Sequence, residues 1–163
     1  MRHLNIHSLQ RSLNSLCNQL ALSYMINDGG CCFVAYLIAS HLDKLGVKYK
    51  LIIFSDEYKN LEKIQAEVCS KIVNRTIKFS VTGIGTCNHY SIYLEGGGSV
   101  NIDDFNEGYI KYYIEGIDSS HIKWIYRTGR WNPSYDRRNN RIIRKTFNAF
   151  FNGYEERNGL SNH

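Results

Sequence analysis

The amino-acid sequence contains one proline in 163 residues, 13 glycines and no long apolar run. Neither glycine nor proline is in excess, which excludes a collagen-like or low-complexity chain. The longest apolar stretch, at residues 31–39, falls far short of the roughly 18 to 20 residues that a membrane-spanning helix needs. Near the N-terminus Asn5, His7 and Gln10 interrupt any apolar segment. We therefore expect no secretory signal, no membrane partner and a cytoplasmic protein.

Cysteines are few, odd in number and without CxxC spacing, so a disulfide framework is not expected and reduced thiols fit better. The chain also lacks a P-loop, a GxGxxG segment, an HExxH motif and an EF-hand loop, and we expect no cofactor and no metal. A zinc site built from the cysteines at 31, 32 and 87 with His89 is an alternative, but its spacing matches no common zinc pattern. Cys17 and Cys69 fall close to helical stripes and are expected to be packing residues.

The composition that is present is typical of an ordered globular protein, because 43% of the residues are hydrophobic and 21% are charged. The length suits one domain with one core. We expect a single domain over residues 1–163 in three parts. These are an N-terminal helix at 1–26, a core at 27–105 and a basic C-terminal extension at 106–163.

Apolar spacing predicts helices in the first half of the chain. One amphipathic helix is expected at about residues 7–24, where leucines recur every three or four residues. A second begins at Cys31 or Cys32 and stops at Gly46, and places His41 on a partly exposed face. A strand is expected at 49–54 because of the β-branched and aromatic content of this segment. A third helix has its apolar stripe at Leu61, Ile64, Val68 and Ile72.

The pattern then changes to a period of two, which predicts strands at 76–82, 89–95 and 99–103, the last two joined by three glycines at 96–98. Further strands are expected at 109–114 and 122–126, with His121 in a loop. A last helix has Ile143, Phe147, Phe150 and Phe151 on one face and ends before Gly153. Helices first and an antiparallel sheet second define an α+β fold.

Three features favour thiol chemistry. Gly29 and Gly30 precede Cys31 at a predicted helix start, where the helix dipole and unpaired N–H groups stabilise a thiolate and receive an oxyanion. His89 opens one strand and Asp103 closes the next. Because a glycine turn joins the two strands, these residues are predicted cross-strand neighbours, and a carboxylate there would orient the imidazole.

The segments Gly29-x-Cys31-x-x-x-Ala35-x-Leu37, Leu45-Gly46-Val47, Asn88-His89-Tyr90 and Ile102-Asp103 resemble the transglutaminase-like branch of the papain-like cysteine enzymes. The resemblance covers about residues 25–105. It implies a helix that carries the cysteine, packed on an antiparallel sheet that carries the histidine and the aspartate. It also implies acyl transfer from a protein or peptide amide, as in a cysteine peptidase, transglutaminase or deamidase.

Carried over by position, the resemblance implies Cys31 as nucleophile, His89 as base and Asp103 as the orienting acid. Cys32 and Asp104 are alternatives for the first and last roles, because each directly follows the favoured residue. Cys31 is favoured because Ala35 then falls at the family's offset, and Asp103 because 89 and 103 flank the glycine turn. Candidates for the oxyanion site are Gln19, Asn27 and Cys32.

Charge supports a second hypothesis. Residues 121–163 carry nine Lys/Arg against three Asp/Glu, whereas residues 1–120 carry 11 against 12. The basic C-terminal segment, in which aromatic and basic residues interleave, suits an acidic partner or nucleic acid. The alternative function is therefore a catalytically inactive relative that acts as a protein- or nucleic-acid-binding module.

Overall fold

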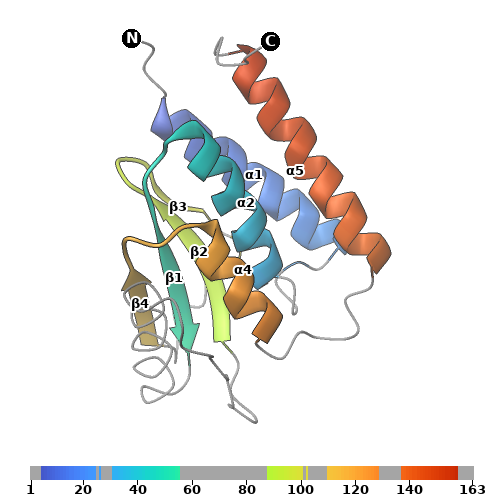
Figure 1. Cartoon of the computed structure of the whole chain (residues 1–163). Coiled ribbons are helices and arrows are strands. Elements are labelled where there is room, and N and C mark those ends of the chain that lie inside the picture. The colour runs from blue at the N-terminus through green and yellow to red at the C-terminus, as the bar shows by residue number, and fades with distance from the viewer. Residues whose placement is uncertain are drawn as a thin grey trace.

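The computed structural model describes residues 5–24, 26, 31–55, 88–100, 102, 110–128 and 137–157. Within these residues, four helices pack with one four-stranded antiparallel sheet (Figure 1). The coarse α+β prediction is thereby confirmed. The helix predicted around Leu61 to Ile72, the strand predicted at 76–82 and the chain break predicted near Pro133 lie outside the described residues.

Helix α1 (Ile6–Tyr24) begins where Asn5 caps it. The Asn5 side-chain oxygen accepts a hydrogen bond from the backbone N–H of Ser8 at 3.0 Å, which satisfies one of the unpaired donors of the first turn. The predicted apolar stripe of leucines is observed, with one difference. Cys17 is fully buried, whereas Leu16 is only partly buried. The packing role predicted for Cys17 is confirmed.

Helix α2 (Cys31–Leu45) starts and stops as predicted. At its C-terminus Val47 N–H donates to the Leu42 carbonyl at 3.0 Å and Gly46 N–H donates to the Asp43 carbonyl at 3.2 Å. This Schellman pair needs a left-handed residue, and Gly46 has φ of 71°. The chain then reverses directly into β1, so β1 runs antiparallel to α2.

The sheet consists of β1 (Tyr49–Ser55), β2 (Asn88–Leu94), β3 (Gly98–Val100) and β4 (Ile110–Ile114) in the order β3-β2-β1-β4. Every neighbouring pair is antiparallel. Tyr90, Ile92 and Leu94 on β2 belong to the main core, as do Leu51 and Ile53 on β1. Ile52 and Phe54 are buried as well, so β1 buries side chains on both faces of the sheet rather than on alternate residues.

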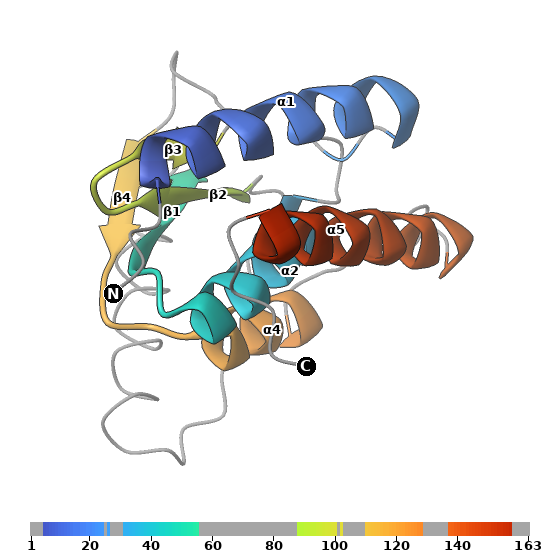
Figure 2. The same cartoon turned by 90° about the horizontal axis from the view of Figure 1, so that it is seen from above.

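Helix α2 is the centre of the packing. It lies on β1 and β2, with helix α4 (Ser119–Thr128) and helix α5 (Arg137–Arg157) against it on either side (Figure 2). Ten of its fifteen residues are buried, so α2 is apolar around most of its circumference, as expected of a helix covered on several sides. Helix α1 covers the edge strand β3, where Gln10 Nε2 donates to the Ser99 carbonyl at 2.7 Å.

Three secondary-structure predictions are wrong. Residues 122–126 form part of α4, not a strand, and His121 lies in the first turn of that helix, not in a loop. The cause is Asp118, which caps the helix through Ser120 N–H at 2.9 Å and thereby favours helix over the β propensity of the aromatic residues. Helix α5 also continues past Gly153 to Arg157, because burial of Phe151 and Tyr154 on either side outweighs the cost of a glycine inside a helix, about 0.5–1 kcal/mol.

Candidate functional site

The topology brings the start of α2 and the start of β2 to one end of the molecule. Because β1 runs antiparallel to α2 and β2 runs antiparallel to β1, α2 and β2 run parallel. The two elements are also in contact. Cys31 is the first residue of α2 and His89 the second of β2, so both backbones lie at this end, which is the lower end in Figure 1.

The chain also returns to this end after β3. Strand β3 runs antiparallel to β2, so Val100 lies nearer the start of β2 than Gly98 does. The register pairs Ile92 with Val100 and Tyr93 with Ser99, and the same register continued along the ladder would bring position 103 opposite His89. Asp103 and Asp104 lie outside the described residues, and of His89 the structure describes the backbone.

The observed ladder stops at Val100. Its carbonyl accepts a hydrogen bond from the Ser91 hydroxyl and another from Ile102 N–H, the latter at 2.9 Å. In the described residues the predicted strand at 99–103 thus ends at Val100. The backbone bends at Ile102, and the Ile102 side chain is buried in the core.

The adjacent cysteines at the start of α2 are both buried, with 4% of Cys31 and 9% of Cys32 exposed. Burial raises the pKa of the Cys32 thiol well above its ordinary value, and negative charge on Cys31 raises it further. Burial therefore holds the Cys32 thiol neutral. Burial likewise raises the pKa of Cys17 to about 12, which suits its packing role.

The oxyanion candidates differ in their surroundings. Gln19 is exposed on α1 and Asn27 lies outside the described residues. Cys32 lies in the first turn of α2, where backbone N–H groups have no intrahelical acceptor and are suited to receive a negatively charged oxygen. Among the described residues, no group of three or more His, Cys, Asp or Glu side chains is arranged to hold a metal.

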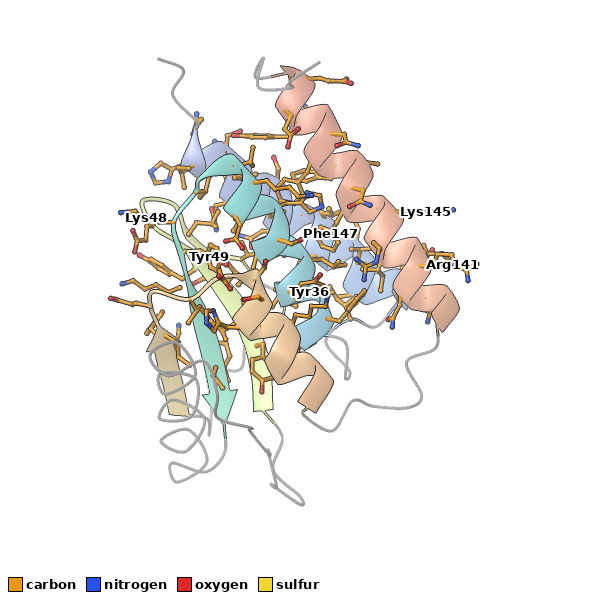
Figure 3. All side chains as sticks on the ribbon, in the orientation of Figure 1. Tyr36, Lys48, Tyr49, Arg141, Lys145 and Phe147 are labelled. Atoms are coloured by element: carbon orange, nitrogen blue, oxygen red, sulfur yellow. The ribbon has the colours of Figure 1, made fainter. Side chains whose placement is uncertain are left out.

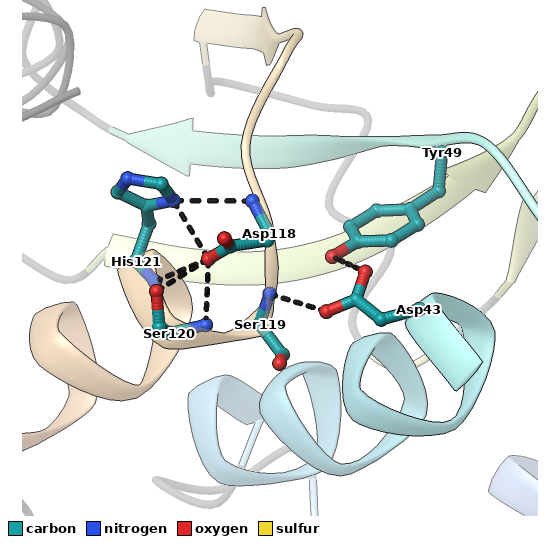
Figure 4. A network of polar contacts seen from close by, with 6 residues as sticks. All are labelled: Asp43, Tyr49, Asp118, Ser119, Ser120 and His121. Carbon is teal, nitrogen blue, oxygen red and sulfur yellow. Dashed lines mark hydrogen bonds and ion pairs between the residues drawn. The ribbon is translucent and has the colours of Figure 1, made fainter. Parts of the chain in front are cut away.

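A polar network lies at the opposite end of α2 (Figure 4). Asp43 accepts hydrogen bonds from the Tyr49 hydroxyl at 2.9 Å and from Ser119 N–H at 2.8 Å. The same carboxylate thus joins α2, β1 and the start of α4. Burial, and then the hydrogen bond to Asp43, raise the pKa of Tyr49, so the phenol stays a donor. This network fixes the C-terminal end of α2, the helix that carries Cys31, against β1 and α4.

The prediction for His41 is wrong. Its side chain is buried, with 8% exposed, between α2 and α5, and its Nε2 lies 2.9 Å from Asn148 Oδ1. The apolar spacing of the helix predicts that His41 is partly exposed. The local sequence does not indicate that α5 covers this residue. The signal that the sequence offered is the set of apolar residues one helical turn from His41, which are Leu37, Ile38 and Leu45.

Comparisons of the chain with protein-family models, with curated proteins and with solved structures found no match. No helix in the described ranges has both the length and the apolar character to cross a membrane.

Proposed function

We propose that the chain is a thiol enzyme that transfers the acyl group of a protein or peptide amide, with Cys31 as nucleophile, His89 as base and Asp103 as the orienting acid. The observation that carries the proposal is the parallel packing of α2 on β2. This packing sets the helix start that holds Cys31 and the strand start that holds His89 at one end of the molecule.

In the proposed reaction the Cys31 thiolate attacks the amide carbonyl carbon and forms a tetrahedral oxyanion. The C–N bond breaks, the leaving amine takes a proton from the imidazolium of His89, and a thioester remains on Sγ. Water or an acceptor amine then gives its proton to the imidazole and attacks the thioester. The product is a carboxylate or a new amide, and Sγ leaves as thiolate.

Two properties of α2 support Cys31 over Cys32 as nucleophile. The thiolate at the first position of a helix interacts favourably with the positive end of the helix dipole. The raised pKa of Cys32 opposes ionisation at the second position. Cys32 contributes its backbone N–H to the oxyanion in this proposal, while its side chain packs in the core.

The test is alkylation by iodoacetamide from pH 5 to pH 9, with the modified cysteine mapped by mass spectrometry. We expect Cys31 to react rapidly near pH 6, and His89→Ala to slow it to the rate of an ordinary thiol, whose pKa is about 8.5. Hydrolysis of p-nitrophenyl acetate gives a second readout. We expect it to fall on the order of 10³-fold in Cys31→Ala and to survive in Cys32→Ala.

Cys17→Ala is the matched control, because Cys17 is a buried cysteine of α1 with a packing role. Slow and uniform labelling of all thiols would refute the enzyme proposal and favour the binding module. If Cys32 is labelled rapidly and Cys31 is not, the acyl-transfer proposal stands and Cys32 is the nucleophile.

A further inference from the structure

The first half of α5 carries basic residues without acidic neighbours. Positions 137, 138, 141, 144 and 145 are Arg or Lys, and the acids of this helix, Glu155 and Glu156, are confined to its end. Arg141, Arg144 and Lys145 are exposed, and none of the ion pairs in the described part of the chain includes them. We define Arg141, Arg144 and Lys145 as the basic face of α5.

This distribution opposes the helix dipole. Cations are favoured near the last turn of a helix and anions near the first, each by about 0.3–1 kcal/mol at the surface. Helix α5 has no acid in its first turn and begins with Arg137 and Arg138. A local charge arrangement that opposes the stability of its own helix is typical of a surface that serves binding.

Contacts with α2 place the basic face at the end of the molecule where Cys31 lies. The Arg144 guanidinium carbon is 5.5 Å from the ring centroid of Phe33, two residues after Cys31. Further along both helices, Asn148 meets His41, so α5 and α2 run in the same direction. Arg141, one turn before Arg144, therefore lies still further toward the start of α2.

Helix α4 approaches the same end from the other side. Ser119 at its start meets Asp43 near the end of α2, whereas the Lys123 ammonium lies 5.8 Å from the ring centroid of Tyr36, nearer the middle of α2. Helix α4 thus runs antiparallel to α2, toward the end that holds Cys31. Figure 3 shows Arg141 and Lys145 on the outer side of α5, away from the sheet.

We propose that the basic face of α5 binds acidic side chains of the peptide or protein substrate, several residues from the amide that Cys31 attacks. This inference rests on the proposed function and names its substrate class. Charge complementarity selects the substrate: Asp and Glu pair with guanidinium and ammonium groups, and Arg binds a carboxylate with two parallel hydrogen bonds. A peptide bound in an extended conformation advances about 3.3 Å per residue, and in this proposal one substrate chain contacts both regions.

The test uses the full chain and a fluorescein-labelled ten-residue peptide rich in glutamate, with binding measured by fluorescence anisotropy. The test variant is Arg141→Gln with Lys145→Gln, which keeps Arg144 on Phe33. The matched control is Lys48→Gln with Arg157→Gln. It removes the same charge from two exposed positions, the turn before β1 and the last residue of α5, at the opposite end of the molecule.

We expect the test variant to weaken binding about fivefold to tenfold and the control to leave it unchanged within about twofold, with circular dichroism equal in both. Binding is expected to weaken as salt is raised. Saturating peptide is expected to slow the alkylation of Cys31 in the wild-type protein, and a lysine-rich peptide of equal length is expected not to slow it.

The inference is overturned if the glutamate-rich peptide binds the test variant and the wild type equally. It is also overturned if a single-stranded oligonucleotide binds through these residues while the peptide does not, because the face then serves nucleic acid. Failure of the proposed function gives a different result. In that case the glutamate-rich peptide would still bind, in the wild type and in Cys31→Ala. Iodoacetamide would modify Cys31 of the wild type slowly, and the peptide would not change that rate.

Discussion

The imidazole of His41 on α2 lies flat on the ring of Phe151 on α5, with centroids 4.3 Å apart and planes inclined by 6°. Asn148 on the same face of α5 holds Nε2 at 2.9 Å. This contact fixes the position of α5 against α2, and with it the distance between the basic face of α5 and the start of α2.

The first prediction concerns pH. Burial, which dominates, lowers the pKa of His41; nearby Lys44 also lowers it, while Asn148 and Glu155 partly offset the shift. The unfolded chain therefore binds a proton on His41 at a higher pH than the native protein does. Stability from this site is complete above about pH 6.5 and is lost as the pH falls toward the lower native pKa. Urea denaturation of the wild type and His41→Gln at pH 7.5 and pH 5 measures this.

In that experiment we expect the wild type to lose more stability than His41→Gln between the two pH values. His7→Gln is the control, since His7 is exposed on α1, and should retain the wild-type dependence. Equal pH dependence of His41→Gln and wild type would contradict the assignment.

The second prediction concerns packing. Phe151 is fully buried and stacks on His41, whereas the adjacent Phe150 is only partly buried. Phe151→Ala is expected to lower the free energy of unfolding by about 3–5 kcal/mol, because a large cavity opens between α2 and α5. Phe150→Ala should cost clearly less. Chemical denaturation provides the comparison, and a reversed ranking would show that the interface is packed differently.

The third prediction contrasts two glycines. Gly153 lies inside α5, and the nearest atom to an added Cβ is the flexible end of Arg157 at 3.4 Å. Gly153→Ala is therefore expected to raise Tm and to stabilise by about 0.5–1 kcal/mol. Gly46→Ala should instead destabilise, because Gly46 has φ of 71°. Stabilisation at both positions would be inconsistent with the Schellman turn.

The fourth prediction concerns the contact of α1 with the β2–β3 turn. A Cβ on Gly97 would lie 2.5 Å from Ile6 Cγ2 and 3.0 Å from the Ile6 carbonyl oxygen. Gly97→Ala is expected to cost about 1–3 kcal/mol, as overpacking does. Adding Ile6→Ala should recover part of this loss, since it removes the nearer atom. Thermal melts of Gly97→Ala, Ile6→Ala and the double variant measure this coupling. If the two single losses of stability simply add in the double variant, the contact is contradicted.

The fifth prediction concerns the cap of α4. Partial burial alone would raise the pKa of Asp118, but hydrogen bonds from Ser120 and His121 and the nearby imidazole outweigh it and lower that pKa. Asp118→Ala should cost about 1 kcal/mol near neutral pH. The contribution of the wild-type carboxylate is complete above about pH 4 and is lost as the pH falls through its lowered native pKa. Asp118→Asn, which retains a capping oxygen, should lose less, and denaturation at pH 7 and pH 3 distinguishes the three proteins.

Much of the fold was predictable because its signals are local. The leucine spacing of α1, the glycine after α2 and the β-branched run of β1 each determine their own element. Helix α4 was not predictable in this way. Ile122 and its aromatic neighbours favour a strand by themselves, and the outcome depends on the Asp118 cap and on packing against α2.

The candidate site divides in the same way. The order of Cys31, His89 and Asp103 along the chain is a property of the sequence, and so is the turn that precedes a helix at Cys31. The parallel run of α2 and β2, which places Cys31 and His89 at one end, follows from the order of strands in the sheet.

The sequence by itself determined the amphipathic faces, the turn glycines and the basic excess of the last 43 residues, because each depends on neighbours within a few positions or on composition alone. Only the tertiary structure decided which helix covers which face. Burial of His41 depends on a residue 107 positions away, and the Arg144–Phe33 contact likewise depends on α5 returning to α2. Such contacts arise from the packing of whole elements, and no local pattern specifies them.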